Sequence, residues 1–228
     1  MSELRKMSLE KYLLHSLPGK IYCIPNFINE NEESQTLKKI YEAPKIKWTT
    51  LLNRKLQNWG GLPSEKGMIA EDIPNWLQCH INKIQDLSIF EEHSKPNHVL
   101  INEYLPGQGI SPHLDGNLFY PTIATISLGS HTVLNFYEPL SESDKMTSTC
   151  PSLVQRLKFK VYVPQRSLIL IQDKMFHHYL HGIEELLEDD DDDNLNIPPD
   201  VQFVAKRSTR VSLTIRHVPK TRRIKIKL

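Results

Sequence analysis

The sequence predicts a mainly β domain with flanking helices, an α+β arrangement in which the strands form a sandwich or jelly roll. From about residue 97 onward, short β-prone segments alternate with Gly, Pro, Ser and Asp turns. Few long helical patterns lie between these segments, which argues against a parallel doubly wound sheet. The expected strands fall within residues 97–105, 121–129, 131–140, 157–164, 166–173 and 209–218.

Residues 1–95 have a different, mixed pattern. IYCIPNFI (21–28) is typical of a short strand, while ENEESQTLKKIYEA (30–43) and DIPNWLQCHINKIQDL (72–87) are typical of amphipathic helices. Between the two helices, Gly60, Gly61 and Pro63 interrupt any regular element, so residues 49–67 are expected to form an exposed loop. Loops of this kind often carry binding contacts. We therefore divide the chain into residues 1–95, a strand-rich core over 96–219 and a tail over 220–228.

Composition places this chain among soluble proteins. No apolar run approaches the roughly 20 residues that cross a bilayer. The first residues lack the apolar core of a signal peptide, so the expected location is cytoplasm and nucleus. Cys23, Cys79 and Cys150 are odd in number and widely spaced, which argues against a disulfide framework and against a thiolate zinc site. Oligomeric state cannot be read from these features.

Charge is unevenly distributed along the chain. Glu184, Glu185, Glu188 and the run 189–193 form an acidic block, within a stretch 184–205 that we interpret as a solvated loop inserted before the last strand. The residues from Arg216 to the end are rich in Lys and Arg. This basic tail either contacts phosphates or simply keeps the chain soluble.

A histidine and an aspartate in P-H-L-D-G form the first candidate metal ligands. His113 and Asp115 are two residues apart, a spacing that puts both side chains on one face of an extended chain. The cluster H-H-Y-L-H-G-I offers a third ligand from His177, His178 or His181, of which we favour His181. Two imidazoles and one carboxylate on one face of an octahedral ion leave three positions open, as in non-heme Fe(II) oxygen chemistry.

Two strand patterns suggest a polar ligand beside this metal. Arg210 and Arg216 are six residues apart in R-V-S-L-T-I-R, so in a strand both point to the same side as Ser212. Two guanidinium groups on one face suit a dicarboxylate. Asn102 and Tyr104 share a face in the same way and offer hydrogen bonds. The alternative is that the arginines are surface residues in ion pairs.

The sequence resembles a known family at these positions. NEYLPGQGISPHLDG, HGI and RVSLTIR occur in the order and spacing typical of the AlkB-like Fe(II)/2-oxoglutarate dioxygenases, over about residues 21–218. The resemblance implies a double-stranded β-helix, or jelly roll, with an N-terminal lid, and a reaction of dioxygen with 2-oxoglutarate at Fe(II). It also implies His113, Asp115 and His181 as iron ligands, and Asn102, Tyr104, Arg210, Ser212 and Arg216 as 2-oxoglutarate contacts.

Many relatives in this family demethylate alkylated bases in DNA or RNA, which makes nucleic acid the expected partner. The predicted lid carries residue types for phosphate contact, stacking and base-edge hydrogen bonds. Trp59 is equally well explained as a core anchor, and Arg54 as an ion-pair partner. Against nucleic acid stand the net charge of only +1 and the acidic block. The alternatives are a protein or other substrate, and a binding module with little turnover. The candidate substrate residues are Arg54, Gln57, Asn58 and Trp59.

Overall fold

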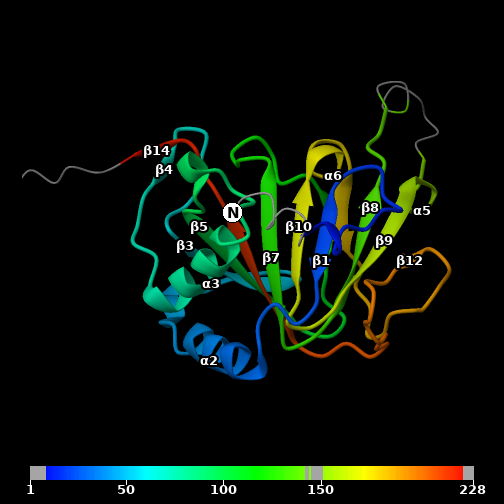
Figure 1. Ribbon diagram of the computed structural model, residues 1–228, viewed down its shortest axis with the longest axis horizontal. Coiled ribbons are helices and arrows are strands. Elements are labelled where there is room, and N and C mark those ends of the chain that lie inside the picture. Colours follow the sequence, from blue (N-terminus) through cyan, green and yellow to red (C-terminus); the bar gives the residue numbers. More distant parts are fainter. Residues whose placement is uncertain (1–8, 142–143, 145–150, 223–228) are drawn as a thin grey trace, which may run out of the picture.

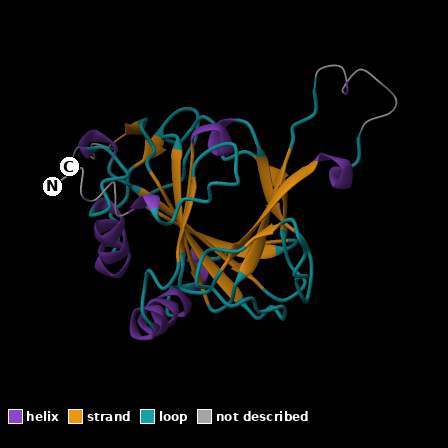
Figure 2. Cartoon of the chain, turned by 45° about the vertical axis from the view of Figure 1, so that its right-hand side comes forward, coloured by secondary structure: helices purple, strands orange, loops and turns teal. Residues whose placement is uncertain are grey.

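The computed structural model describes residues 9–141, 144 and 151–222. Two facing sheets form the body of the protein, and Figure 2 shows the longer helices outside one of them. The larger sheet has the order β1-β10-β7-β13-β5-β3-β2 and the smaller one β12-β9-β8-β11-β6, while β14 and β4 pair separately. Every pairing in the larger sheet is antiparallel. The predicted sandwich or jelly roll is therefore confirmed.

All six strands expected after residue 97 are present. In the larger sheet, the strands are β1 (Ile21–Ile24), β2 (Thr49–Leu51), β3 (Arg54–Trp59), β5 (His98–Tyr104), β7 (Thr122–Leu128), β10 (Leu168–Gln172) and β13 (Arg210–Arg216). The smaller sheet consists of β6 (Ile110–His113), β8 (Thr132–Tyr137), β9 (Leu157–Val163), β11 (Leu180–Ile183) and β12 (Leu195–Asn196). The short pair is β4 (Met68–Ile69) with β14 (Thr221–Arg222). Residues 223–228 of the predicted basic tail lie outside the described residues.

Two amphipathic helices cover the outer face of the larger sheet (Figure 1). α2 (Glu30–Tyr41) begins at a capping box, in which the Asn29 side chain accepts from the backbone of Glu32 and the Glu32 carboxylate accepts from the backbone of Asn29. α3 (Asn75–Gln85) follows Pro74, which cannot donate a hydrogen bond. Both helices were predicted. The shorter helices are α5 (Leu153–Arg156), α6 (Asp173–His177), η1 (Lys45–Lys47) and η2 (Glu92–Ser94).

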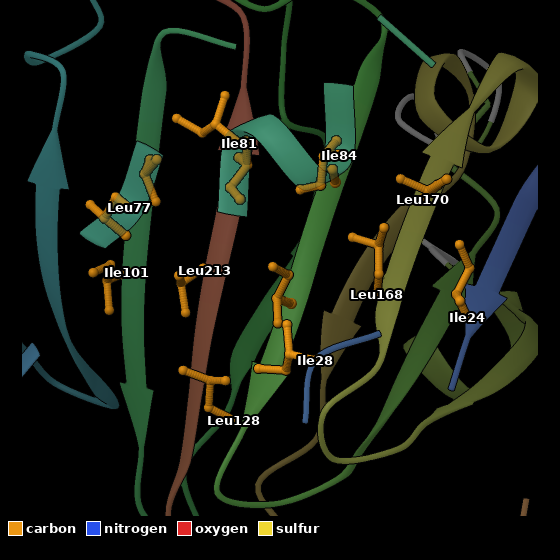
Figure 3. Packing of buried hydrophobic residues seen from close by; sticks show 14 of the residues in the cluster. Ile24, Ile28, Leu77, Ile81, Ile84, Ile101, Leu128, Leu168, Leu170 and Leu213 are labelled. Carbon is orange, nitrogen blue, oxygen red and sulfur yellow. The ribbon is translucent and has the colours of Figure 1, made fainter. Parts of the chain in front are cut away.

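Apolar side chains of α3 interlock with alternate residues of the sheet. Figure 3 shows Leu77, Ile81 and Ile84 of α3 above Ile101 and Leu213 of the strands, all of them buried. Because side chains alternate along a strand, the residues between these core positions face the other sheet. This alternation is what leaves polar side chains of β5 and β13 inside the sandwich.

The stretch 49–67 is not the exposed loop that the sequence predicts. β2 and β3 form an antiparallel hairpin, and β3 pairs with β5 along five residues, from Lys55↔Glu103 to Trp59↔Val99. The boundary predicted at residue 95 falls between η2 and β5, yet β1, β2 and β3 all belong to the larger sheet. Cys23 is buried and Cys79 exposed, both as free thiols, while Cys150 lies outside the described residues. Within those residues, no helix has the length and apolar character that a membrane span requires.

Candidate active site

A cavity of about 500 Å³ opens between the two sheets. β5, β7, β10 and β13 line it from the larger sheet, and β6, β8, β9 and β11 from the smaller one. Its volume is in the range of natural small-ligand sites. All eight residues predicted to hold the metal and the cosubstrate line this one cavity, together with Arg54.

The three predicted metal ligands come together at the cavity wall. His113 ends β6 and is the register partner of His181 on β11, with ring centroids 4.6 Å apart. Asp115 lies two residues beyond β6, and its Oδ2 is 3.4 Å from Nε2 of His181. Two donors at about 2.1 Å from one octahedral ion in adjacent positions lie roughly 3 Å apart. The separation of these two atoms therefore fits a shared ion.

The two alternative histidines lie elsewhere. Nε2 of His178 is 2.6 Å from Oε1 of Glu138, in a partly exposed ion pair. His177 ends α6 and is exposed. Neither side chain lines the cavity. The structure therefore places His181, and not these two, beside His113 and Asp115.

The His181 imidazole has the chemical state that a metal requires. Burial lowers the pKa of His181 to about 4, despite the opposing charge of Asp115, so the ring is neutral at physiological pH. Nδ1 of His113 donates to the carbonyl oxygen of Ser111 at 2.8 Å, which leaves Nε2 of His113 with a free lone pair. His113, Asp115 and His181 are neighbours in pairs, but their donor atoms, like those of any other three His, Cys, Asp or Glu side chains among residues 9–141, 144 and 151–222, are not arranged as a complete metal-binding cluster.

The two predicted arginines occupy different ends of the same strand face. Arg210 Nη2 donates to Ser127 Oγ at 2.9 Å, and its guanidinium lies 5.8 Å from the Tyr104 ring centroid. Burial lowers the pKa of Arg210 to about 10, which still leaves it charged at neutral pH. Arg216 Nη1 donates to Asp115 Oδ1 at 2.9 Å. Arg216 thus stands next to the candidate metal ligands, and Arg210 at the far end of the strand.

Several buried polar atoms in this cavity have no hydrogen-bond partner among the described residues. They are Nε of Arg54, Arg210 and Arg216, and Oδ1 of Asn102. Buried polar atoms are nearly always paired in folded proteins, and an unpaired one costs about 1–3 kcal/mol. Three of the four are cationic donors. A ligand bearing carboxylates would satisfy them, which fits the predicted dicarboxylate.

The four residues predicted to contact substrate lie on opposite faces of β3. Arg54 points into the cavity, and Asn58 lies on the same strand face, where its Oδ1 accepts from Nε2 of His98 at 3.2 Å. Gln57 is fully buried on the other face, and its amide donates to the Ile40 carbonyl of α2.

Trp59 shares this other face, where Nε1 donates to Gln57 Oε1 and the ring packs edge-on against Trp76. The structure therefore brings Arg54 to the cavity and keeps Gln57 and Trp59 away from it. For Trp59, the core-anchor interpretation holds.

Two further residues support Arg216 and were not identified from the sequence. The ring of Phe119 covers the guanidinium, with its centroid 3.8 Å from Cζ of Arg216. His98 of β5 is the register partner of Arg216 on β13. Burial lowers the pKa of His98 to about 3, so this ring does not add a second positive charge. His98 is four residues before Asn102, so strand alternation could have found it. The position of Phe119 depends on a loop and left no such signal.

Comparison with known proteins finds one family model and several relatives that match most of this chain. The model of the 2OG-Fe(II) oxygenase superfamily matches residues 20–216. The chain is 47% identical over 220 residues to a Danio rerio protein named "Probable RNA/DNA demethylase ALKBH6", covering 95% of this chain and 93% of that protein. It is 31% identical to protein L905 of Acanthamoeba polyphaga mimivirus, covering 86% of this chain and 84% of L905.

Solved structures with the same fold are more distant in sequence. OsALKBH1 superposes with a TM-score of 0.54 at 13% identity, covering 88% of this chain and 99% of that one. A Pseudomonas putida prolyl-4-hydroxylase superposes with a TM-score of 0.53 at 10% identity, covering 97% of this chain and 100% of that one. At such low identity, the two structures establish the jelly-roll fold of this chain and nothing finer.

Proposed function

The chain belongs to the 2OG-Fe(II) oxygenase superfamily, and we propose that it is a dioxygenase that oxidatively demethylates alkylated bases in DNA or RNA. One observation carries the assignment. His113, Asp115 and His181 lie in the same cavity as two buried arginines whose Nε atoms have no partner among the described residues. The name of the Danio rerio relative, which shares 47% identity, supports the substrate class.

We assign Fe(II) to His113, Asp115 and His181. The donor set, two imidazoles and one carboxylate, is the facial triad that leaves positions open for a cosubstrate and dioxygen. Asp115 is held by Arg216 at 2.9 Å and His113 by the Ser111 carbonyl, so outer contacts orient two of the three ligands. Bound iron and 2-oxoglutarate together supply oxidation of a C–H bond by dioxygen, with succinate and carbon dioxide as co-products.

We assign 2-oxoglutarate to the polar face of β5 and β13. Arg210, beside the buried Tyr104 at the end of the strand away from Asp115, suits the distal carboxylate. Arg216, which touches Asp115, suits the end nearest the metal. Asn102 and Ser212 are register partners between these two arginines. On this assignment, the chain's own residues fix the direction in which the cosubstrate lies.

Replacing Arg210 with lysine is expected to raise the KM for 2-oxoglutarate about ten- to a hundredfold, because an ammonium cannot form the paired hydrogen bonds of a guanidinium. The kcat at saturating 2-oxoglutarate should change much less. Steady-state succinate formation measures both values. Arg166→Lys is the matched control, because Arg166 pairs with Glu33 outside the cavity. An unchanged KM in Arg210→Lys would place the carboxylate elsewhere.

The substrate proposal predicts iron-dependent release of formaldehyde from N-methylated nucleosides or oligonucleotides. Hydroxylation of an N-methyl carbon gives an N-hydroxymethyl group, which loses formaldehyde and leaves N–H. A parallel screen of methylated oligonucleotides and methylated peptides measures this product. Release only from peptides would replace nucleic acid by protein as the substrate. Iron and 2-oxoglutarate binding without succinate formation on any substrate would favour a binding module.

A further inference from the structure

A second cavity, of about 340 Å³, lies on the other face of the larger sheet. Asn102 and Tyr104 of β5 point into the active-site cavity, and Glu103 between them points into the second one. Likewise, on β3, Arg54 lines the active-site cavity and Lys55 lines the second one. The two cavities are therefore back to back across β3 and β5, near the sheet edge formed by β2. The second is lined by Tyr41, Lys45, Trp48, Thr50, Lys55 and Glu103.

Two aromatic rings form a wall of this second cavity. Tyr41 ends α2 and Trp48 precedes β2, and their planes are within 25° of parallel at a centroid distance of 6.2 Å. Tyr41 is 52% exposed, although aromatic residues of this size are usually covered. Trp48 is half-buried and packs against the hydrophobic core on one side. Accessible aromatic rings beside a cavity are platforms on which unpaired bases stack.

The polar groups of the cavity complement a nucleotide. Glu103 is buried, its carboxylate is 3.5 Å from Lys55 Nζ and accepts from the Tyr41 hydroxyl, and its remaining lone pairs offer an acceptor at the floor. Lys45 is exposed and forms no ion pair with any residue that the structure describes, so its ammonium is available to a phosphate. A carboxylate accepts readily from an exocyclic amino group of a base.

The surroundings of the hairpin restrict the path of a polyanion. In the turn between β2 and β3, Asn53 donates to Glu185 of the acidic segment. That side of the hairpin is negative and disfavours phosphates. The edge strand β2 itself is exposed along its whole length and carries no acidic residue. β2 is the edge strand of the larger sheet, and its Thr50 lines the second cavity.

We propose that the second cavity binds an unpaired base flanking the modified base on the same single strand, with preference for bases that carry an exocyclic amino group. The inference rests on the proposed function. Trp48 and Tyr41 stack on the base, Glu103 accepts from its amino group, and Lys45 and Lys55 contact the adjacent phosphates.

The test measures binding of unmodified 12-nucleotide single strands of dC and of dT by fluorescence anisotropy at fixed salt. Trp48→Ala is expected to weaken dC binding roughly 5- to 150-fold, the range observed for loss of one stacked base. Lys45→Glu should weaken both strands, and Glu103→Gln should remove the preference for dC over dT. Trp48→Phe, which keeps an aromatic face, should retain most of the affinity.

Lys38→Glu is the matched control, because Lys38 is an exposed lysine of α2 that does not line this cavity. Succinate formation without nucleic acid should be unchanged in all variants. If Trp48→Ala unfolds, the affinity of Lys45→Glu tests the second binding site in its place. Wild-type affinity in both Trp48→Ala and Lys45→Glu would overturn the second site alone. If the wild-type protein binds and demethylates no nucleic acid, the proposed function fails and the second site fails with it.

Discussion

Replacing His181 with alanine is expected to remove bound iron and to lower 2-oxoglutarate turnover at least about 100-fold, the largest effect on activity that we expect. His181 is neutral, and its Nε2 lies 3.4 Å from Asp115 Oδ2, so on the proposed assignment the variant loses one of three ligands. Outer contacts of metal ligands alone are typically worth about 10- to 100-fold, and a ligand itself is worth more. Metal analysis of the purified variant and succinate formation measure the two effects.

The neighbouring histidine provides the control for this experiment. His178 is three residues earlier, pairs with Glu138 and does not line the cavity, so His178→Ala should keep full iron content and turnover. Loss of iron in His178→Ala together with retention in His181→Ala would show that the wrong histidine was assigned. Circular dichroism of both variants separates a lost ligand from a lost fold.

The core of the site could be predicted from the sequence because strand alternation is local. In R-V-S-L-T-I-R, the aliphatic residues pack under the helices, as Leu213 does, and the polar residues between them line the cavity. The same rule placed Asn102 and Tyr104 on the cavity side of β5. The choice among three histidines was less certain from the pattern alone. The strand pairing that sets His181 opposite His113 is what distinguishes the three candidates for the third ligand.

The hairpin could not be predicted because tertiary contacts replace the usual apolar signal. On the helix-facing side of β3, Gln57 occupies a core position and pairs its amide with the end of α2. A hydrophobicity pattern counts glutamine as polar, so a buried glutamine is predicted to be exposed to solvent. The sequence therefore predicts that the candidate substrate residues of 54–59 share one loop surface. In the structure, alternate residues of this strand point to opposite faces of the sheet, with Arg54 at the active-site cavity and Lys55 at the second cavity.

The acidic block was predicted to be a solvated loop, and for Asp189 this prediction is wrong. Its carboxylate accepts from Arg207 Nε at 2.7 Å and from Arg207 Nη2 at 2.5 Å, and His131 Nε2 lies 3.2 Å away. All three side chains are buried. Arg207 also donates to the Glu184 carbonyl at 2.7 Å, so this ion pair fastens the segment that follows His181. Glu188 and Asp190 remain exposed, as predicted.

Replacing Asp189 with asparagine is expected to lower the free energy of unfolding by about 3 kcal/mol, because the buried guanidinium of Arg207 loses its counter-charge. For a domain of this size, the loss corresponds to a melting temperature roughly 6–12 °C lower. Asp191→Asn, an exposed change in the same acidic run, should leave the melting temperature nearly unchanged. Thermal and urea unfolding of the two variants give the comparison.

The same ion pair predicts how stability depends on pH. Burial acts to raise the pKa of Asp189, but the hydrogen bonds and charges of Arg207 and His131 outweigh it and hold the pKa below its ordinary value. A depressed folded-state pKa contributes stability that is present above the unfolded value of about 3.9 and is lost as pH falls through the folded value. The difference between wild type and Asp189→Asn should therefore be full above about pH 5 and shrink below about pH 4. A difference that persists unchanged at low pH would mean that packing, and not charge, explains the effect of the substitution.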